Sequence, residues 1–211
     1  VNSSPTFVGK PGAGYSDVDH PGYKTFKTNY ADRIPMVYVG SNDGMLHGFN
    51  ACIVGVTPGC TTADAGKELL AYIPSQVYAN LSRVTDKDYN TSHRYLTDGT
   101  PMVADVYSSG TSSWRTILVG GLNGGGQGYY ALNVTNPKDA AKSEPVFSEA
   151  NAASLLLWEF SNADDSDMGY SYNLPHINSF TGQARQIVKM ENGKWAVIVG
   201  NGYNSANGKA E

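Results

Sequence analysis

The chain has 211 residues and a formal net charge of −4, and 16% of its residues are charged, against about a quarter in an average protein. This balance excludes a nucleic-acid binder, which needs a basic surface. The 40% of hydrophobic and 11% of aromatic residues are enough to bury a core, so disorder is excluded too. The 24 glycines and 14 tyrosines favour short strands and turns over helices.

The first part of the chain carries no clear periodic pattern. We therefore predict that residues 1–32 form a lead-in linker and that residues 33–211 form the folded domain. The sequence shows no signal peptide, and it has no stretch of about 20 apolar residues, the length that a membrane-spanning helix needs.

A repeated pattern of strand and glycine runs through the rest of the chain. Three apolar runs each end at a glycine, and a second glycine follows eight residues after each of them: Met36–Gly40 with Gly48, Thr116–Gly120 with Gly128, and Ala196–Gly200 with Gly208. We interpret each unit as a hairpin in which a buried strand, ending at residues 40, 120 or 200, leads through a glycine-rich turn into a second strand.

Flanking segments extend each hairpin toward four strands. Gly99–Val106 and Asn173–Ile177 are predicted innermost strands, and Glu68–Pro74 and Leu155–Phe160 are predicted outer strands. Four antiparallel strands per repeat are typical of a propeller blade. The sequence thus predicts an all-β fold, a fragment of a β-propeller that stops within a blade, with an ordinary β-sandwich as the alternative.

Long insertions separate the predicted strands at residues 75–98 and 135–153. The first begins with a short helical pattern over 75–81, for which Ser75 is a candidate N-cap. Binding residues are often carried on loops, and Tyr and Arg are enriched at protein–protein hot spots. We therefore expect the interaction surface in these insertions, with packing against the next blade as the alternative. The candidate residues of the first insertion are Tyr78, Arg83, Tyr89, His93, Arg94 and Tyr95.

Several ordered motifs resemble the C-terminal propeller domain of the PilC/PilY family of type IV pilus proteins. The motifs lie at Arg33–Ala51, His93–Pro101, Trp114–Gly121, Gly124–Thr135 and Val199–Ser205. The resemblance implies quinoprotein-like blades in a protein that is not itself a quinoprotein. It further implies a role in pilus biogenesis, control of retraction and adhesion.

The same resemblance implies a location and partners. The protein would act outside the cytoplasm, from the periplasm to the pilus tip at the cell surface. Its partners would be pilus-tip minor pilins and host or abiotic surfaces. The family's calcium-binding loop is expected downstream of Gly200–Tyr203, in a part of the parent protein beyond this sequence. No cofactor is therefore expected in this fragment.

The two cysteines, Cys52 and Cys60, enclose a segment rich in turn residues, with Gly55, Pro58 and Gly59. This spacing allows a disulfide that closes a local loop, and no metal-ligating partners lie nearby in the sequence. Two free thiols in a reducing compartment are the alternative.

The remaining polar motifs do not point to a metal or to catalysis. Asp164–Gly169 resembles part of a calcium loop, but the position of its bidentate acid is held by Pro175, which favours a solvated turn. The glycine-rich stretch Gly120–Gly128 is interpreted as a turn with positive-φ positions, because no helix follows it to bind a phosphate. None of the four histidines has a metal-ligand neighbour at a suitable spacing: His20, His47, His93 and His176.

No nucleophile elbow, Walker loop or metalloprotease motif appears, so the sequence predicts no enzyme. A quinoprotein dehydrogenase is one alternative, but that family stacks its quinone on a pair of adjacent cysteines, and Cys52 and Cys60 are not adjacent. Trp114, Trp158 and Trp195 are better explained by blade packing. A scaffold propeller of an outer-membrane assembly machine is a further alternative.

Overall fold

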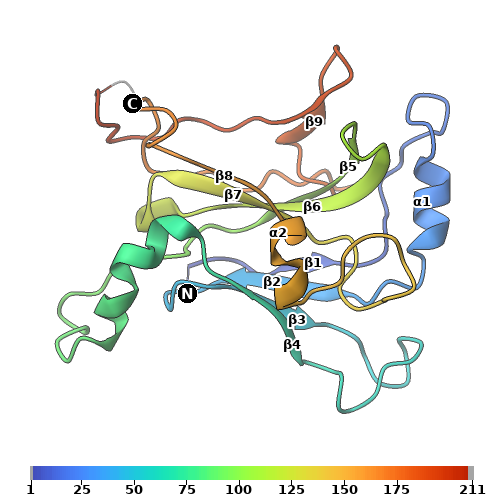
Figure 1. The fold of residues 1–211 in the computed structure, drawn as a ribbon, viewed down its shortest axis with the longest axis horizontal. Helices are drawn as coiled ribbons and strands as arrows, with labels where there is room; N and C mark the ends of the chain where they lie inside the picture. The colour runs from blue at the N-terminus through green and yellow to red at the C-terminus, as the bar shows by residue number, and fades with distance from the viewer. Residues whose placement is uncertain (1, 209–211) are drawn as a thin grey trace.

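The computed structural model describes residues 2–208, and the regular elements of this part of the chain are mostly antiparallel strands joined by long connections (Figure 1). Two four-stranded sheets, β1-β2-β3-β4 and β5-β6-β7-β8, lie face to face, and a two-stranded sheet, β9-β10, follows them. In the described part of the chain, no helix is long and apolar enough to cross a membrane.

The first sheet begins earlier than the sequence suggested. Its strands are β1 (Thr6–Val8), β2 (Met36–Gly40), β3 (Leu46–Asn50) and β4 (Glu68–Tyr72). The prediction of a linker over residues 1–32 is wrong, because β1 pairs antiparallel with β2 and supplies the edge strand of this sheet. A three-residue strand is too short to give a sequence pattern, which explains the error.

Helix α1 (Tyr23–Asn29) also belongs to the folded body. It buries Tyr23 and Phe26 against Trp114 of the second sheet, and Tyr30 packs beside them. The Tyr23 hydroxyl donates a 2.6 Å hydrogen bond to Asp105 Oδ2. Arg33, just after α1, donates to Thr116 Oγ1 and to the Gly9 carbonyl. The N-terminal segment is therefore bonded to the second sheet as well as to the first.

The second sheet comprises β5 (Met102–Ser108), β6 (Ser113–Gly121), β7 (Gly128–Asn133) and β8 (Leu156–Ser161). It lies in the middle of the molecule and is apolar on both faces. Leu118, Tyr130 and Leu132 meet the first sheet, whereas Ile117, Val119 and Tyr129 meet β9-β10. The predicted inner strand at 99–106 and the predicted outer strands at 68–74 and 155–160 thus have strand counterparts.

The two large sheets repeat each other, but with a different alignment from the glycine spacing. In β2–β3, Gly40 lies opposite Leu46 and Met36 opposite Asn50. In β6–β7, Gly121 lies opposite Tyr129 and Ile117 opposite Asn133. Gly40 therefore corresponds to Gly121, not to Gly120, because the two turns differ in length. Each sheet also has one register shift between its third and fourth strands. It lies at Gly48/Phe49 of β3 and at the corresponding Ala131/Leu132 of β7, which confirms this alignment.

The third sheet consists of β9 (Ile187–Lys189) and β10 (Trp195–Val197). Two predictions fail here. Residues 173–177 form no strand and contribute one isolated bridge, Ile177 to Ala184. The run 196–200 is a strand only as far as Val197, and Ile198 is 56% exposed. Among the described residues β10 pairs with β9 alone, so no strand is hydrogen-bonded to its other edge.

Short helical turns occupy the connections: the 3-10 segments η1 (Ser75–Thr85), η2 (Asn123–Gly125) and η3 (Glu149–Asn151), and α2 (Ala152–Leu155). Ser75 is not the predicted N-cap. Pro74 holds that position, and the Ser75 backbone N–H instead donates to Glu159 Oε1 of the second sheet at 2.8 Å. The start of the first insertion is thus fixed to the neighbouring sheet.

The glycines of 120–128 serve close packing, not the predicted positive φ. In that stretch the left-handed position is Asn123, with φ 48°. A Cβ on Gly125 would lie 1.7 Å from the Leu96 carbonyl oxygen, and one on Gly121 would lie 2.7 Å from the Ser171 carbonyl oxygen. These glycines therefore let the chain from neighbouring connections pass against the β6–β7 turn.

Candidate functional site

Several connections emerge at one end of the sheets and form a common surface, at the left in Figure 1. They are the β2–β3 turn, the β4–β5 connection, the β6–β7 turn and the segments around Tyr170 and Tyr203. Contacts join them directly: Asn42 Nδ2 lies 3.1 Å from His93 Nε2, and the Tyr170 N–H donates to the Tyr203 carbonyl at 2.8 Å. Residues far apart in the sequence thus meet at this end.

Aromatic side chains dominate this end. Tyr89 and His93 have ring centroids 5.3 Å apart, and Tyr95 packs edge-on against His93 at 5.1 Å. The Tyr89 hydroxyl donates to the Arg94 carbonyl at 3.3 Å, which closes this part of the insertion on itself. Tyr95 is nevertheless 46% exposed. The insertion thus holds a small aromatic cluster that faces solvent.

A second aromatic cluster adjoins the first across Gly124. A Cβ on Gly124 would lie 2.9 Å from the Tyr172 hydroxyl and 3.0 Å from Tyr95 Cδ2, so both side chains lie close to this glycine. Tyr172 and Tyr203 stack with ring centroids 5.8 Å apart and planes 25° apart, and Tyr170 lies beside Tyr203. We call the combined set the tyrosine surface; it consists of Tyr89, His93, Tyr95, Tyr170, Tyr172 and Tyr203.

Two buried oxygens lie behind the tyrosine surface without a hydrogen-bond partner among the described residues: Asn42 Oδ1 and Asp98 Oδ1. Burial raises the pKa of the Asp98 carboxyl. A hydrogen bond from the Asn2 side chain and the charge of His93 act in the opposite direction and lower it, but burial has the larger effect. Burial and the neighbouring Tyr203 likewise raise the pKa of Tyr172, which keeps its hydroxyl protonated. The surface therefore presents ring faces and hydroxyl groups, whereas the two acceptor oxygens lie beneath it, out of contact with solvent.

The six residues that the sequence singled out do not form one surface. Tyr89, His93, Arg94 and Tyr95 lie together, on or beside the tyrosine surface. Tyr78 is 59% exposed but lines a different groove, between β4 and α2. Arg83 is exposed near the end of η1. The sequence missed Tyr170, Tyr172 and Tyr203, although Tyr203 lies in one of the motifs that carry the family resemblance.

The second insertion, residues 135–153, is largely exposed over 138–143 and 148–150, but one residue at its centre packs against the second sheet. Glu144 is 7% exposed. It accepts a 2.7 Å hydrogen bond from Asn133 Nδ2 and pairs with Arg115 at 2.9 Å. Glu144 thus ties this insertion to the sheet that it interrupts and not to the next one.

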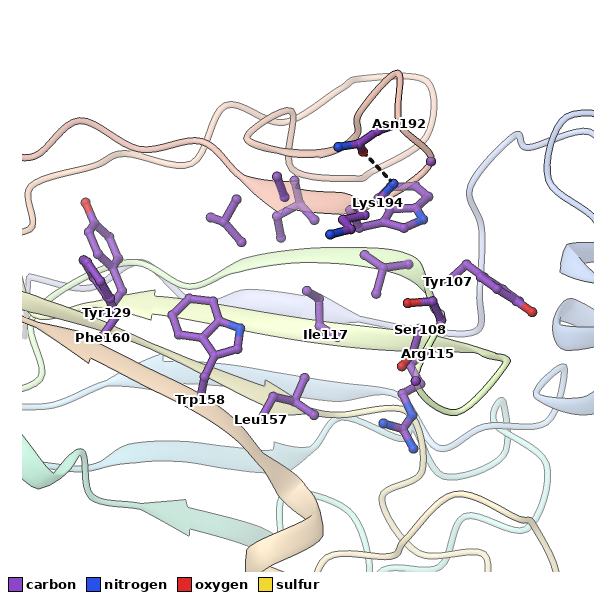
Figure 2. Close-up of a pocket in the computed structure, with 18 of the residues that line it drawn as sticks. Tyr107, Ser108, Arg115, Ile117, Tyr129, Leu157, Trp158, Phe160, Asn192 and Lys194 are labelled. Atoms are coloured by element: carbon purple, nitrogen blue, oxygen red, sulfur yellow. Dashed lines mark hydrogen bonds between the residues drawn. The ribbon is translucent and has the colours of Figure 1, made fainter. Parts of the chain in front are cut away.

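A large apolar groove of about 870 Å³ lies between the second sheet and β9-β10 (Figure 2). Tyr129, Trp158 and Phe160 line it, and they correspond to Leu46, Leu70 and Tyr72 of the first sheet. In the first sheet that face is covered by the next sheet, where Tyr72 packs on Tyr130. The groove is therefore the face on which successive sheets stack, and it does not by itself indicate a ligand.

The three tryptophans lie along the same boundary between the second and third sheets. Trp114 is buried and contacts Trp195 with ring centroids 5.9 Å apart. Trp158 lines the groove. Packing between sheets accounts for Trp114 and Trp195, whereas Trp158 is 37% exposed in the groove.

The acidic cluster and the cysteines form local structures. Asp164 Oδ2 accepts the Ser161 N–H at 2.8 Å, and Asp165 Oδ1 accepts the Asp167 N–H at 2.9 Å, as in a tight turn. Over residues 2–208, no group of three or more His, Cys, Asp or Glu side chains is placed to hold a metal. Cys52 and Cys60 are joined by a disulfide, with Cα atoms 5.9 Å apart.

Comparisons with known proteins agree with this architecture. Residues 1–211 match the family described as the PilY1 beta-propeller domain. The chain is 38% identical over 216 residues to the type IV pilus biogenesis factor PilY1 of Pseudomonas aeruginosa strain UCBPP-PA14, covering all of this chain and 15% of that protein. It is 34% identical over 215 residues to a PilY1 homolog of Xylella fastidiosa strain Temecula1, covering 14% of it.

A solved structure shows the same fold. The crystal structure of the Pseudomonas aeruginosa PilY1 C-terminal domain superposes with a TM-score of 0.62 at 34% identity, over 96% of this chain and 32% of that one. The predicted propeller fold is confirmed by this match. The chain spans about a seventh of the length of the curated relatives.

Proposed function

Because this chain belongs to the family of PilY1 β-propeller domains, we propose that it is a non-enzymatic binding module of a type IV pilus biogenesis factor. The observation that carries the proposal is the tyrosine surface, where Tyr95, Tyr172 and Tyr203 are each about half exposed. Tyrosine offers a large, stiff contact area with a polar tip, which suits recognition. The module would act in pilus biogenesis, in the control of retraction and in adhesion.

The proposal places the module outside the cytoplasm, between the periplasm and the pilus tip. The Cys52–Cys60 disulfide supports this location, because disulfides persist in oxidising compartments. Partners would be minor pilins at the tip and host or abiotic surfaces. The sequence supports a role without catalysis, since it carries none of the common nucleophile or metalloprotease motifs.

The test uses the full-length pilus protein that contains this domain. Tyr95→Ala, Tyr172→Ala and Tyr203→Ala are combined in one variant, and Tyr78→Ala is the matched control, an exposed tyrosine outside the tyrosine surface. Surface pili, twitching and adherence to cells and to plastic are measured for each. We expect the triple variant to lose adherence, pili or normal retraction, while the control retains all three. A secreted triple variant with unchanged pili, twitching and adherence would overturn the proposal.

A further inference from the structure

We propose that residues 52–60, which we call the disulfide loop, insert into an apolar hollow of a protein partner at the pilus tip. The loop is a second contact site, at the other end of the first sheet from the tyrosine surface. The β2–β3 turn, whose Asn42 contacts His93 of the tyrosine surface, precedes β3, whereas the disulfide loop follows β3. In Figure 1 the connection from β3 to β4 extends away from the sheets at the lower right. The choice of a pilus-tip protein as partner rests on the proposed function.

The disulfide loop exposes three aliphatic side chains within four residues. Ile53 is 60% exposed, Val54 47% and Val56 74%. In the part of the chain that the structure describes, none of the three belongs to an apolar cluster of the core. Single exposed apolar residues are common on protein surfaces, but a contiguous group of them marks a contact site.

The disulfide loop is closed by a covalent bond and by internal hydrogen bonds. Cys52 and Cys60 join its two ends. Between them, the Thr57 N–H donates to the Ile53 carbonyl at 2.8 Å, and the Ile53 N–H donates to Thr57 Oγ1 at 3.0 Å. The exposed side chains are β-branched and have few rotamers. Burying them against a partner therefore costs little conformational entropy, which favours binding.

The charges around the disulfide loop indicate what kind of site it fits. Residues 51–63 contain no charged side chain. The next charged residue, Asp64, is already paired, because its Oδ1 accepts a 2.9 Å hydrogen bond from Lys138 Nζ of the second insertion. A charged partner surface would lose its hydration against the loop without gaining an ion pair. The complementary site is therefore uncharged and apolar.

The composition of the loop favours a protein over a lipid surface. Segments that bind a membrane interface usually carry Trp or Tyr at the level of the headgroups and Lys or Arg near anionic lipids, and residues 52–60 contain none of these. A preformed hollow in a protein can enclose the aliphatic side chains. A standard protein interface buries about 800 Å² per partner, which is more than three side chains supply. The loop would thus be an anchor within a larger contact.

The experiment measures binding of the full-length pilus protein to the purified soluble domains of the minor pilins of the same pilus. Ile53→Ser and Val56→Ser each keep the disulfide and remove one aliphatic side chain from the contact. We expect each to weaken binding by roughly tenfold through the lost apolar burial. Val18→Ser is the matched control, because Val18 is a valine outside the loop that is 89% exposed. It should bind as the unchanged protein does.

Three results would overturn the inference. The first is that Ile53→Ser and Val56→Ser bind the minor pilins as tightly as the unchanged protein. The second is that they lower the melting temperature of the full-length protein while Val18→Ser does not, which would mean that the loop packs against another part of the same protein. The third is that the unchanged protein binds vesicles of phosphatidylethanolamine and phosphatidylglycerol and Ile53→Ser does not, which would make lipid the occupant.

Failure of the inference is distinguishable from failure of the proposed function. If the loop variants bind normally while the triple tyrosine variant loses adherence, pili or retraction, the inference is wrong and the role of the tyrosine surface stands. If the unchanged protein binds none of the minor pilins, the proposed partners are wrong and the inference falls with them.

Discussion

His47 Nε2 lies 2.9 Å from Asp43 Oδ2, so the imidazole on β3 is bonded back to the turn that precedes it. The other ring nitrogen, Nδ1, contacts Glu68 on β4. His47 therefore links the β2–β3 turn to β4, the edge strand opposite β1 in the first sheet. The same turn carries Asn42, which contacts His93 of the tyrosine surface.

This arrangement makes the stability of the first sheet depend on pH. Desolvation lowers the pKa of His47, but the hydrogen bonds and charges of Glu68 and Asp43 outweigh it and raise the pKa above its usual value. A raised pKa in the folded state stabilises the fold fully below the unfolded pKa of about 6.5, and this contribution is lost as pH rises through the folded pKa. We expect the melting temperature of the unchanged chain to exceed that of His47→Gln most at pH 6 and least at pH 8.5. A difference that grows with pH would contradict this assignment.

Close packing at the β6–β7 turn predicts that alanine is destabilising at Gly125 and tolerated at Gly110, which lies in an open turn. Gly125→Ala would place a Cβ 1.7 Å from the Leu96 carbonyl oxygen, and a backbone neighbour cannot move aside without shifting the turn. We expect a loss of about 1–3 kcal/mol of unfolding free energy. Gly110→Ala, in the β5–β6 turn, meets nothing within 4 Å and is the control. Denaturant unfolding compares them, and equal stability of the two variants would show that the turn is not tightly packed.

Two buried tyrosines should respond in opposite ways to removal of the hydroxyl. The Tyr23 hydroxyl bonds to Asp105, which is 1% exposed, so Tyr23→Phe leaves a buried carboxylate oxygen without that donor. A loss of about 1–3 kcal/mol is expected. The Tyr38 hydroxyl is buried with no partner among the described residues, so Tyr38→Phe should leave stability unchanged or raise it. Chemical denaturation of both variants gives the comparison, and a more harmful Tyr38→Phe would be the contrary result.

The disulfide should make a modest contribution to stability. Cys52 and Cys60 are eight residues apart, and closing so short a loop is worth about 2–3 kcal/mol in the chain-entropy model. We expect the exported protein to show the mass of the oxidised form before reduction. The double variant Cys52→Ala with Cys60→Ala should unfold at lower denaturant concentration. Two free thiols in the exported protein would contradict the bond.

The sequence predicted the strands with long apolar runs and missed the elements fixed by tertiary contacts. β2 and β6 were evident because their apolar runs continue to a glycine, whereas β1 has three residues and depends on its pairing with β2. The glycine spacing located the repeat but aligned its two copies incorrectly. The reason is that glycines occur in turns, within strands and where two backbones pass close together, so equal spacing does not mean equivalent positions. Gly48 lies within β3 against the Tyr38 ring, whereas Gly128 begins β7.

The candidate site was half predictable for a similar reason. Tyr89, His93 and Tyr95 share one insertion and could be grouped by their proximity in the sequence. Tyr170, Tyr172 and Tyr203 reach the same surface only because the sheets stack and bring their connections to a common end. No local pattern contains that information, because Tyr95 and Tyr172 come together only where both lie against Gly124 of a third segment.

The N-terminal segment crosses the boundary between the two large sheets and is bonded on both sides of it. Ser3 Oγ accepts the Gly40 N–H of β2, Thr6 Oγ1 donates to the Pro101 carbonyl before β5, and Arg33 reaches Thr116 on β6. Pulling the sheets apart would have to break these bonds together with the apolar contacts between the sheets. Under mechanical load, the two sheets should therefore resist as one unit, and the force needed to separate them should fall when Arg33 is replaced.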